Sequence, residues 1–166
     1  MAQPEFTDAI ALLKADHREV EALFEKFESA SSSGKQAIAE KICNELKIHA
    51  TIEEEIFYPA LEAKIEQSTL SEAYVEHDGA KVLINDILAS DKVDELYEAK
   101  VKVLSEEIKH HVGEEEMRSE GMFTQAREAG VDLVALRDQL MTRKQELKAQ
   151  LESGGLPVAE PRVIRV

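Results

Sequence analysis

The sequence predicts an all-α protein: an up-down-up-down four-helix bundle with an additional helix near the C-terminal end of the chain. Apolar residues recur every three or four positions through most of the 166 residues, which is the period of a helix that buries one face, and no strand-like alternation is present. Short breaks rich in Ser, Gly or Pro divide this pattern into five segments. Because the connections are short, successive helices are expected to be antiparallel neighbours.

A cap and a proline define the first two predicted helices. The first helix spans about residues 8–29, with Thr7 or Asp8 as its N-cap. The second spans about residues 35–65 and contains Pro59. Because proline lacks a backbone N–H and clashes with the preceding turn, Pro59 should kink this helix or weaken its hydrogen bonding one turn earlier.

Polar caps also mark the next two predicted helices. The third spans about residues 69–89 and opens with a Thr-Leu-Ser-Glu capping box, in which the first and fourth side chains satisfy free backbone N–H groups. Ser90 and Asp91 cap the fourth helix, which continues to about residue 120, where Gly121 weakens it.

These elements give one domain and two C-terminal additions. Residues 1–130 are expected to form the bundle, and residues 131–153 a fifth helix that packs either on the bundle or in a dimer contact. Residues 154–166 contain two prolines and are expected to form a flexible tail. Whether the protein is a monomer or a homodimer stays open at this stage.

The composition argues against several partners. The net charge of −14 disfavours nucleic acid, since phosphate binding needs a basic surface, and it disfavours an anionic membrane surface for the same reason. The single cysteine, Cys43, allows no disulfide within the chain, which fits a reducing compartment. The sequence contains no signal-peptide pattern and no apolar run long enough for a membrane span, so a cytoplasmic location is expected.

A histidine occupies the apolar stripe of each of the four bundle helices. His49 is followed four residues later by Glu53. His111 is followed at the same spacing by Glu115, and on a helix this spacing puts an imidazole and a carboxylate on one face. The six candidate metal ligands are His17, His49, Glu53, His77, His111 and Glu115. His110 lies about 100° from its stripe and is expected to be exposed or to support a ligand.

The carboxylates make this set chemically informative. A carboxylate inside an apolar stripe is unstable unless it is paired or bound to a cation, and two facing carboxylates repel each other. Two divalent metal ions would remove both penalties and would explain why imidazole nitrogens converge at one level of the bundle. The neighbouring acids are expected to form a solvated face; they are Glu54, Glu55, Glu114 and Glu116.

The same residues resemble a known family. The matching segments are Asp16-His17, Leu23-Phe24, His49 to Pro59, Glu76-His77 and His110 to Glu116. Together they resemble the hemerythrin-like HHE cation-binding domain over about residues 8–128. The resemblance implies a four-helix bundle that holds a non-haem di-iron centre bridged by two carboxylates.

The resemblance also implies a role for each candidate ligand. Each histidine pair would bind one iron ion, His17 with His49 and His77 with His111. Glu53 and Glu115 would bridge the two ions, and an oxo or hydroxo group could complete the bridge. Open positions on the iron ions could take dioxygen, nitric oxide or peroxide.

One position departs from the family pattern. Oxygen-carrying hemerythrins have a further histidine one turn after the histidine of the third helix, and Lys81 stands there in this chain. A protonated lysine cannot bind a metal ion, and it is expected to extend outward to solvent. Water, Glu114, Tyr74 or an exogenous ligand could fill the vacant place, and the departure puts reversible oxygen carriage in doubt.

Several functions are compatible with this pattern. The leading hypothesis is a di-iron protein that binds dioxygen or a related small ligand for sensing, storage or stress response. A peroxide-consuming, catalase-like enzyme is an alternative, although the sequence contains no dedicated acid–base group beyond the metal set. Iron or zinc buffering without oxygen chemistry is another, and the preference of zinc for four-coordinate sites argues mildly against that metal. A metal-free bundle with the fifth helix as a partner surface is the remaining alternative.

Overall fold

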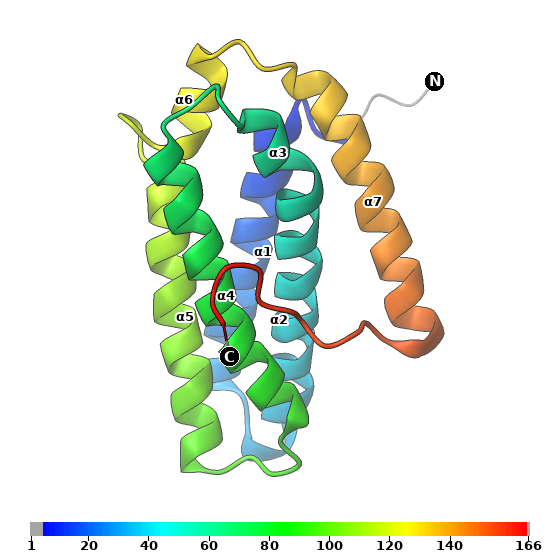
Figure 1. Ribbon diagram of the computed structural model, residues 1–166. Coiled ribbons are helices and arrows are strands. Elements are labelled where there is room, and N and C mark those ends of the chain that lie inside the picture. The colour runs from blue at the N-terminus through cyan, green and yellow to red at the C-terminus, as the bar shows by residue number, and fades with distance from the viewer. Residues whose placement is uncertain (1–4, 166) are drawn as a thin grey trace.

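Four long helices form the bundle that the sequence predicts. The computed structural model describes residues 5–165, and within that range it contains helices and no strand. The bundle helices are α1 (Ala9–Ser29), α2 (Ser32–Ile52), α4 (Gln67–Ala89) and α5 (Glu95–Glu116). They follow one another around the bundle in this order, so the chain runs up-down-up-down (Figure 1). In the described part of the chain, no helix is both long and apolar enough to cross a membrane.

Local sequence accounts for α1. The side chain of Asp8 caps the helix, because its Oδ1 accepts a hydrogen bond of 2.9 Å from the backbone N–H of Ala11. Buried residues then recur every three or four positions along one face: Ile10, Leu13, His17, Val20 and Phe24. The predicted start and end of this helix are confirmed.

The second predicted helix is divided into three elements, so the prediction of one helix over residues 35–65 is wrong. The elements are α2, a π-helical turn η1 (Glu53–Phe57) and the short helix α3 (Tyr58–Leu61). In a regular helix the ring of Pro59 clashes with the carbonyl group four residues earlier, and the wider π turn relieves that clash. The disturbance expected one turn before Pro59 is therefore present. The helix ends before Ala63, whose φ of 60° is left-handed.

The start of α4 differs from the prediction. The helix begins at Gln67, two residues before the predicted capping box at Thr69. The hydroxyl group of Thr69 does not cap the helix, because it accepts a hydrogen bond of 3.1 Å from the side-chain amide of Gln125. A long-range partner thus replaces the local one that the sequence pattern indicates.

The limits of α5 also differ from the prediction. The helix begins at Glu95, where Oδ1 of Asp94 accepts a hydrogen bond of 2.9 Å from the N–H of Tyr97, rather than at the Ser-Asp pair a few residues earlier. It ends at Glu116, short of the predicted residue 120. The ligand-bearing part of the helix lies well inside both limits.

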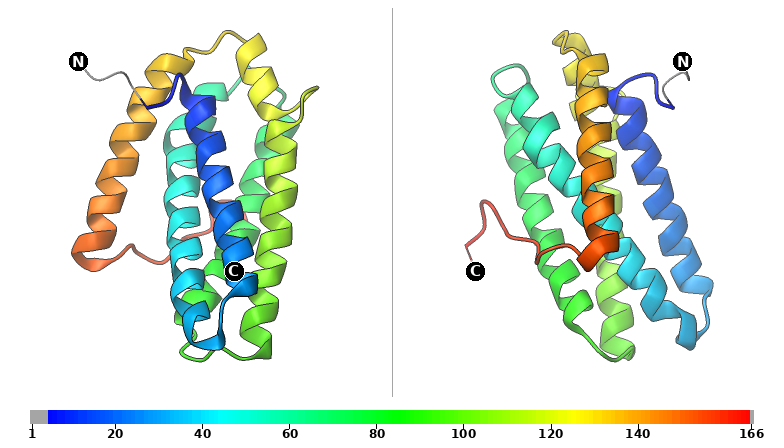
Figure 2. Two further views of the ribbon diagram at one scale, coloured as in Figure 1. Left: turned by 180° about the vertical axis from the view of Figure 1, so that it is seen from behind. Right: turned by 90° about the vertical axis from the view of Figure 1, so that its right-hand side faces the viewer.

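Two further helices follow the bundle. The sequence does not predict α6 (Met122–Glu128), because two turns are too short for a periodic signal. The predicted fifth helix is α7 (Leu133–Gly154), capped by Asp132. Its buried leucines pack toward α1 and α2, so α7 lies on the outside of the bundle (Figure 2); they are Leu133, Leu136, Leu140 and Leu147.

The C-terminal tail differs from the flexible segment expected over residues 154–166. Residues 156–165 contain no regular helix or strand, yet they pass in front of α2 and lie along α4 (Figures 1 and 2). The side-chain amide of Asn85 makes two hydrogen bonds with the backbone of Ala159, at 2.8 and 3.1 Å. The carboxylate of Asp78 accepts hydrogen bonds of 2.6 to 3.0 Å from three consecutive backbone N–H groups, those of Arg162, Val163 and Ile164. Residues 1–4 and 166 lie outside the described range.

Two apolar clusters fill the bundle, one toward each end. One cluster includes Leu13, Ile52, Phe57, Leu70 and Phe123 together with the buried leucines of α7. The other includes Val20, Leu46, Ile84, Val101 and Leu104. Along the chain, His17, His77, His111 and Glu115 lie between residues of the two clusters, whereas His49 and Glu53 directly follow Ile48 and Ile52 of the first cluster. The six candidate ligands thus form a buried polar group beside both apolar parts of the core.

Candidate metal centre

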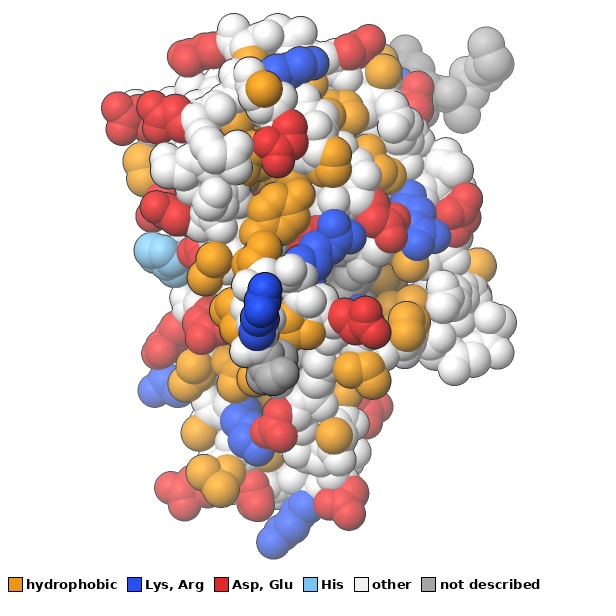
Figure 3. Space-filling view, in the orientation of Figure 1, with side chains coloured by type: hydrophobic (Ala, Val, Ile, Leu, Met, Phe, Trp, Pro, Cys, Tyr) orange, Lys and Arg blue, Asp and Glu red, His pale blue; other side chains and the backbone are white. Residues whose placement is uncertain are grey.

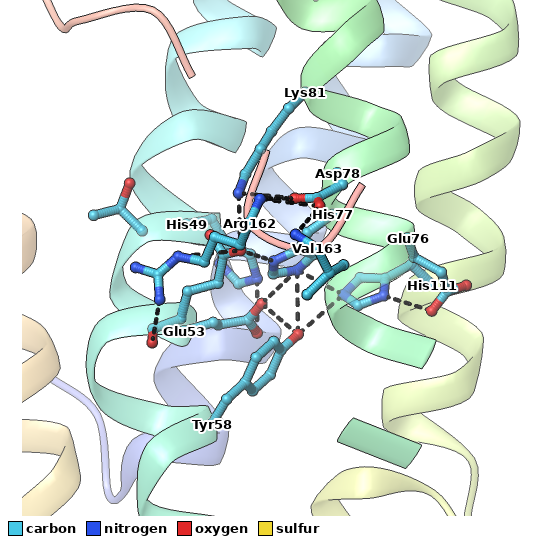
Figure 4. Close-up of polar contacts among 12 residues, drawn as sticks. His49, Glu53, Tyr58, Glu76, His77, Asp78, Lys81, His111, Arg162 and Val163 are labelled. Atoms are coloured by element: carbon cyan, nitrogen blue, oxygen red, sulfur yellow. Dashed lines mark hydrogen bonds and ion pairs between the residues drawn. The ribbon is translucent and has the colours of Figure 1, made fainter. Parts of the chain in front are cut away.

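Four histidine side chains meet at one level of the bundle. Each of α1, α2, α4 and α5 contributes one, and two glutamates join them from η1 and α5. The structure brings together all six predicted candidates, each at most 7% exposed: His17, His49, Glu53, His77, His111 and Glu115. Figure 4 shows four of these side chains pointing toward one another in the interior of the bundle.

The ligand atoms fall into two overlapping groups. His17 and His49 form half-site one, and their Nε2 atoms are 3.2 Å apart. His77 and His111 form half-site two, and their Nε2 atoms are 3.1 Å apart. In each half-site the two nitrogens and one oxygen of each glutamate lie within 4.8 Å of one another, so each group could hold a metal ion.

The spacing of the paired Nε2 atoms fits a shared cation. Two neutral imidazoles that carry their hydrogens on Nδ1 present lone pairs at Nε2, and these repel at 3.1 to 3.2 Å. A metal ion placed about 2.1 Å from each of two nitrogens, at a right angle, separates those nitrogens by about 3.0 Å. The observed pairs are therefore spaced as two neighbouring ligands of one ion.

Each glutamate places one oxygen near each half-site. Oε1 of Glu53 is 3.1 Å from Nε2 of His49, and its Oε2 is 3.1 Å from Nε2 of His77. Glu115 makes the matching approach to the other histidine of each pair, with its Oε2 at 3.4 Å in half-site one and its Oε1 at 2.9 Å in half-site two. The two carboxylates therefore span the gap between the half-sites side by side.

Two of these carboxylate oxygens have no hydrogen-bond donor. Among the described residues, Oε1 of Glu53 and Oε2 of Glu115 are buried and accept no hydrogen bond. The nitrogens Nε2 of His49 and His17 lie 3.1 and 3.4 Å from these two oxygens, so either a proton on each nitrogen or a cation between the two atoms would compensate the buried charge. The donor set of nitrogens and carboxylate oxygens fits two metal ions, which would satisfy both atoms.

Carboxylates behind the centre orient three of the four histidines. The contacts at Nδ1 are His17 with Glu116 at 2.7 Å, His49 with Asp16 at 3.0 Å and His111 with Glu76 at 3.1 Å. Lys144 forms an ion pair with Asp16, and Arg18 forms one with Glu116. A carboxylate at Nδ1 fixes the ring and leaves Nε2 free for a metal ion. Glu116 is thus part of the site, and its prediction as a solvated side chain is wrong.

His77 lacks such a partner. Its buried Nδ1 makes no hydrogen bond to any described residue, and Oε1 of Glu54 is 3.8 Å away. That oxygen accepts a hydrogen bond of 2.8 Å from Nζ of Lys81, which is also 3.3 Å from Asp78 (Figure 4). Lys81 is 6% exposed and Glu54 is 3% exposed. The expectations that Lys81 extends to solvent and that Glu54 is solvated are therefore wrong.

The hydroxyl group of Tyr58 lies at half-site two, although Tyr58 is not among the six predicted candidates (Figure 4). Its distances are 2.7 Å to Oε1 of Glu115, 3.0 Å to Oε2 of Glu53, 3.1 Å to Nε2 of His77 and 3.4 Å to Nε2 of His111. The phenol O–H donates to the carboxylates. Tyr58 thus adds a neutral hydroxyl group to the histidine and glutamate side chains that it contacts.

The π turn explains why the helical period misses Tyr58. In a regular helix a residue five positions after Glu53 points about 140° away from it. In η1 the N–H of Tyr58 bonds to the carbonyl group of Glu53, five residues earlier, so the wider turn brings Tyr58 back to the face of Glu53. The one sequence signal for this change is the adjacent Pro59.

The other candidates for the place left by Lys81 lie elsewhere. The ring of Tyr74 packs edge-on against the ring of Tyr58, with centroids 5.3 Å apart. The side chain of Glu114 is 46% exposed and lies 3.8 Å from His110, which is itself exposed as expected. Glu114 belongs to neither of the two groups of candidate ligand atoms.

Opposite charges dominate the electrostatics of the metal-free centre. Burial by itself lowers the pKa of His49, but the carboxylates of Glu53 and Asp16 outweigh burial and raise this pKa to about 10. Burial and the charge of Glu115 raise the pKa of Glu53, but the neighbouring histidines outweigh them and lower it to about 2. Burial likewise lowers the pKa of His111, and Glu115 raises it well above its usual value. The carboxylates thus require positive charge beside them, from protons or from metal ions.

The fold and the donor set together define a class of protein: a four-helix bundle with a buried histidine–carboxylate cluster that could hold metal ions. The sequence model of the hemerythrin HHE cation-binding domain matches residues 8–123. The chain belongs to this family, as the resemblance of its motifs predicts.

A solved structure supports the fold. The crystal structure of a hemerythrin HHE cation-binding domain-containing protein from Mycobacterium kansasii matches with a TM-score of 0.72 and 21% sequence identity. The match covers 91% of this chain and 96% of that one, so it includes helices beyond the bundle. No curated protein matches the chain.

Proposed function

We propose that this protein binds two iron ions and that the resulting centre takes up dioxygen or a related small ligand, such as nitric oxide or peroxide, for sensing, storage or stress response. One ion would lie in each half-site, and Glu53 and Glu115 would bridge them. Membership of a cation-binding family supports the metal, and the donor set supports two ions rather than one.

The observation that carries the proposal is the orientation of the two bridging glutamates. Each has one oxygen toward each histidine pair, and each has one buried oxygen without a hydrogen-bond donor among the described residues. A single ion would satisfy only one half-site. Two ions satisfy all four nitrogens and all four carboxylate oxygens.

Ligand chemistry favours iron over zinc. Each half-site offers two imidazole nitrogens and two carboxylate oxygens and leaves positions for further ligands. Zinc prefers closed four-coordinate sites, often with thiolate ligands, whereas iron commonly takes histidine and carboxylate with open positions. When bound, a pair of iron ions supplies reversible redox chemistry toward oxygen-containing small ligands.

The protein's own residues prepare the histidines for this role. Asp16, Glu76 and Glu116 each accept a hydrogen bond from Nδ1 of one histidine, which holds the hydrogen on that atom and directs the Nε2 lone pair inward. Apolar clusters pack next to the centre toward both ends of the bundle.

We assign Tyr58 to the ligand position that Lys81 leaves vacant. Burial and the charges of Glu115 and Glu53 raise the pKa of Tyr58 well above its usual value, so in the metal-free protein the phenol stays a hydrogen-bond donor. Beside a bound cation this pKa would be lower, and Tyr58 would then be able to offer its phenol oxygen as a ligand.

Metal analysis joined to absorption spectroscopy tests the proposal. We expect roughly two iron ions per chain and a near-ultraviolet oxo-bridge absorption that disappears on reduction and returns in air. His49→Ala should abolish both. The control is His110→Ala, because His110 is exposed and lies outside both groups of ligand atoms. No iron, or zinc bound as well as iron with no redox response, would contradict the proposal and favour metal buffering or a metal-free bundle.

Peroxide consumption is a second candidate, and the hydroxyl group of Tyr58 favours it. In this alternative Tyr58 would not bind the metal: its phenol would keep its hydrogen and could donate a hydrogen bond beside the open positions of half-site two. Iron-loaded protein should then release oxygen from hydrogen peroxide, and Tyr58→Phe should lose that activity while it retains its iron. If Tyr58→Phe consumes peroxide at the wild-type rate, the hydroxyl group has no part in the activity.

A further inference from the structure

A cavity of about 470 Å³ extends from the metal centre to the C-terminal tail. The four candidate ligand histidines line it, and so do seven consecutive tail residues, 156–162. These tail residues are half-buried or exposed, so the segment also faces solvent. With the tail in place, each of the four histidines is at most 7% exposed. The tail therefore forms a wall, one chain thick, between part of this cavity and the solvent.

Three side chains of α4 hold the tail. Asp78, Lys81 and Asn85 follow one another at spacings of three and four residues, which places them on one face of the helix. Asp78 accepts hydrogen bonds from three consecutive backbone N–H groups of the tail. The other hydrogen bonds join Asn85 to the backbone of Ala159, at 2.8 and 3.1 Å, and Nζ of Lys81 to the carbonyl oxygen of Glu160, at 3.1 Å. The tail is thus fastened along one helix of the bundle.

His77 of half-site two adjoins these contacts. It precedes Asp78 in the chain, and Lys81 also holds Glu54, whose Oε1 is 3.8 Å from Nδ1 of His77 (Figure 4). Nε of Arg162, in the tail, is 3.8 Å from the same oxygen of Glu54. The tail is therefore connected to the immediate surroundings of half-site two.

The tail is held by hydrogen bonds and not by a buried apolar face. From residue 157 to residue 165 no side chain is buried, whereas α7 buries four leucines. The apolar side chains Val158, Val163 and Ile164 are 71%, 52% and 39% exposed. Segments with few buried apolar contacts open at a lower free energy than the core does. The tail can therefore leave α4 while the bundle stays folded.

We propose that the tail is a strap that controls the access of small molecules to half-site two. Fastened to α4, the strap closes one side of the cavity that leads to the histidines. Released, it opens a path from the solvent to His77. Figure 3 shows the face that the strap crosses, where basic and acidic side chains lie among apolar ones. In the loaded protein the strap governs how fast small molecules reach the metal ions, and this part of the proposal rests on the proposed function.

Histidine modification in the metal-free, full-length protein tests the strap. Diethyl pyrocarbonate reacts with the lone pair of a neutral imidazole, and mass spectrometry gives the rate at each histidine. The double variant Val163→Pro/Ile164→Pro removes two of the three N–H groups that bind Asp78. We expect His77 to react about tenfold faster, or more, in this variant than in the wild type. Exposed His110 should react at one rate in all proteins.

The matched control is Val163→Ala/Ile164→Ala, which shortens the same side chains and keeps both N–H donors. It should retain the wild-type rate at His77. Hydrogen exchange at the N–H of Arg162, which both variants keep, shows whether the tail is released, and it should be faster in the proline variant alone. The urea midpoint of the bundle should agree among the three proteins, because the tail contributes no buried side chain after residue 156.

Four outcomes would overturn the proposal. They are a released tail with His77 still protected, unchanged exchange at Arg162 in the proline variant, equal effects of the proline and alanine variants, and a lower urea midpoint that accounts for the faster modification.

Removal of bound metal by a chelator provides a second rate, which should rise in the proline variant only. If the chain binds no iron, histidine modification still decides whether the strap exists. If iron is bound and neither rate changes, the strap alone is refuted. The strap and the proposed iron centre can therefore fail separately.

Discussion

The two half-sites present similar donor atoms but differ in how the protein fixes them. In half-site one, both histidines have a carboxylate oxygen within 3.0 Å of Nδ1, and each carboxylate is itself ion-paired with a basic side chain. In half-site two, His111 has such a partner at 3.1 Å. Nδ1 of His77 has none among the described residues, and Glu54 stands 3.8 Å away while it binds Lys81.

The two half-sites therefore differ mainly in the residues that support the ligand side chains, whereas the histidine and carboxylate ligand atoms themselves are alike. A ring with a carboxylate at Nδ1 keeps its direction when the metal leaves Nε2. A ring held only by the metal can then turn. We therefore expect half-site one to retain a bound ion more firmly. We expect half-site two, with a freer histidine and the added Tyr58, to exchange its ion or react more readily.

The largest effect is expected from the removal of a group that both half-sites share. Glu53→Gln removes one carboxylate charge from each half-site, so we expect both ions to be lost and the protein to purify with less than about half an ion per chain. Glu55→Gln is the matched control, because Glu55 is exposed and pairs with Arg143. Elemental analysis of the two variants would refute the shared role if Glu53→Gln retained one full ion.

Changing the carboxylates next to the Nδ1 atoms of the histidines should affect the metal affinities of the two half-sites differently. Asp16→Asn removes the charge at Nδ1 of His49, and we expect it to weaken metal binding in half-site one by about tenfold to a hundredfold. Glu54→Gln should weaken half-site two by less than about threefold, because Glu54 makes no hydrogen bond to His77. Competition with a chelator measures both affinities, and equal losses in the two variants would remove the distinction between the half-sites.

A smaller effect is expected from the hydroxyl group that belongs to half-site two alone. In the metal-free protein, Tyr58→Phe removes the donor to Oε1 of Glu115, so the free energy of unfolding should fall by about 1.5 kcal/mol. Tyr97→Phe is the control, since the buried hydroxyl of Tyr97 has no hydrogen-bond partner among the described residues. Urea unfolding that gives equal losses for both variants would show that Tyr58 contributes only by packing.

The most gradual effect is a dependence on pH. The pKa of His49 rises from 6.5 to about 10, so in the metal-free protein its protonated form contributes stability that is complete below about pH 6.5 and is lost as pH approaches 10. Metal binding needs the neutral ring, so added metal competes with that proton. The gain in melting temperature that added metal produces should therefore be larger at pH 9 than at pH 6.5. A gain that stays constant over this range would contradict the raised pKa.

Much of the fold and the six candidate ligands can be predicted from spacing along single helices. The apolar period finds the bundle helices, and the four-residue spacing of His49 and Glu53 places both on one face. The rest depends on contacts between distant segments. Glu116 reaches His17 across 99 residues, and the inward position of Lys81 depends on partners from another helix and the tail. No local pattern encodes such pairs.

Tyr58 illustrates a second limit of the sequence pattern. The helical period fails at this residue because the period itself changes in η1. A prediction that assumes 3.6 residues per turn places the side chain on the wrong face, however well the flanking helix is recognised. The error is confined to one turn, and that turn carries a group of half-site two.

The hydrogen bonds that hold the tail affect which sequence changes the tail can accept during evolution. Asp78 holds the tail through three backbone N–H groups and not through side chains. Any residue except proline supplies that donor, so the hydrogen bonds to Asp78 by themselves place no demand on the side chains of residues 162–164. Relatives with dissimilar tails can therefore share this arrangement, and the aspartate is the feature by which to recognise it.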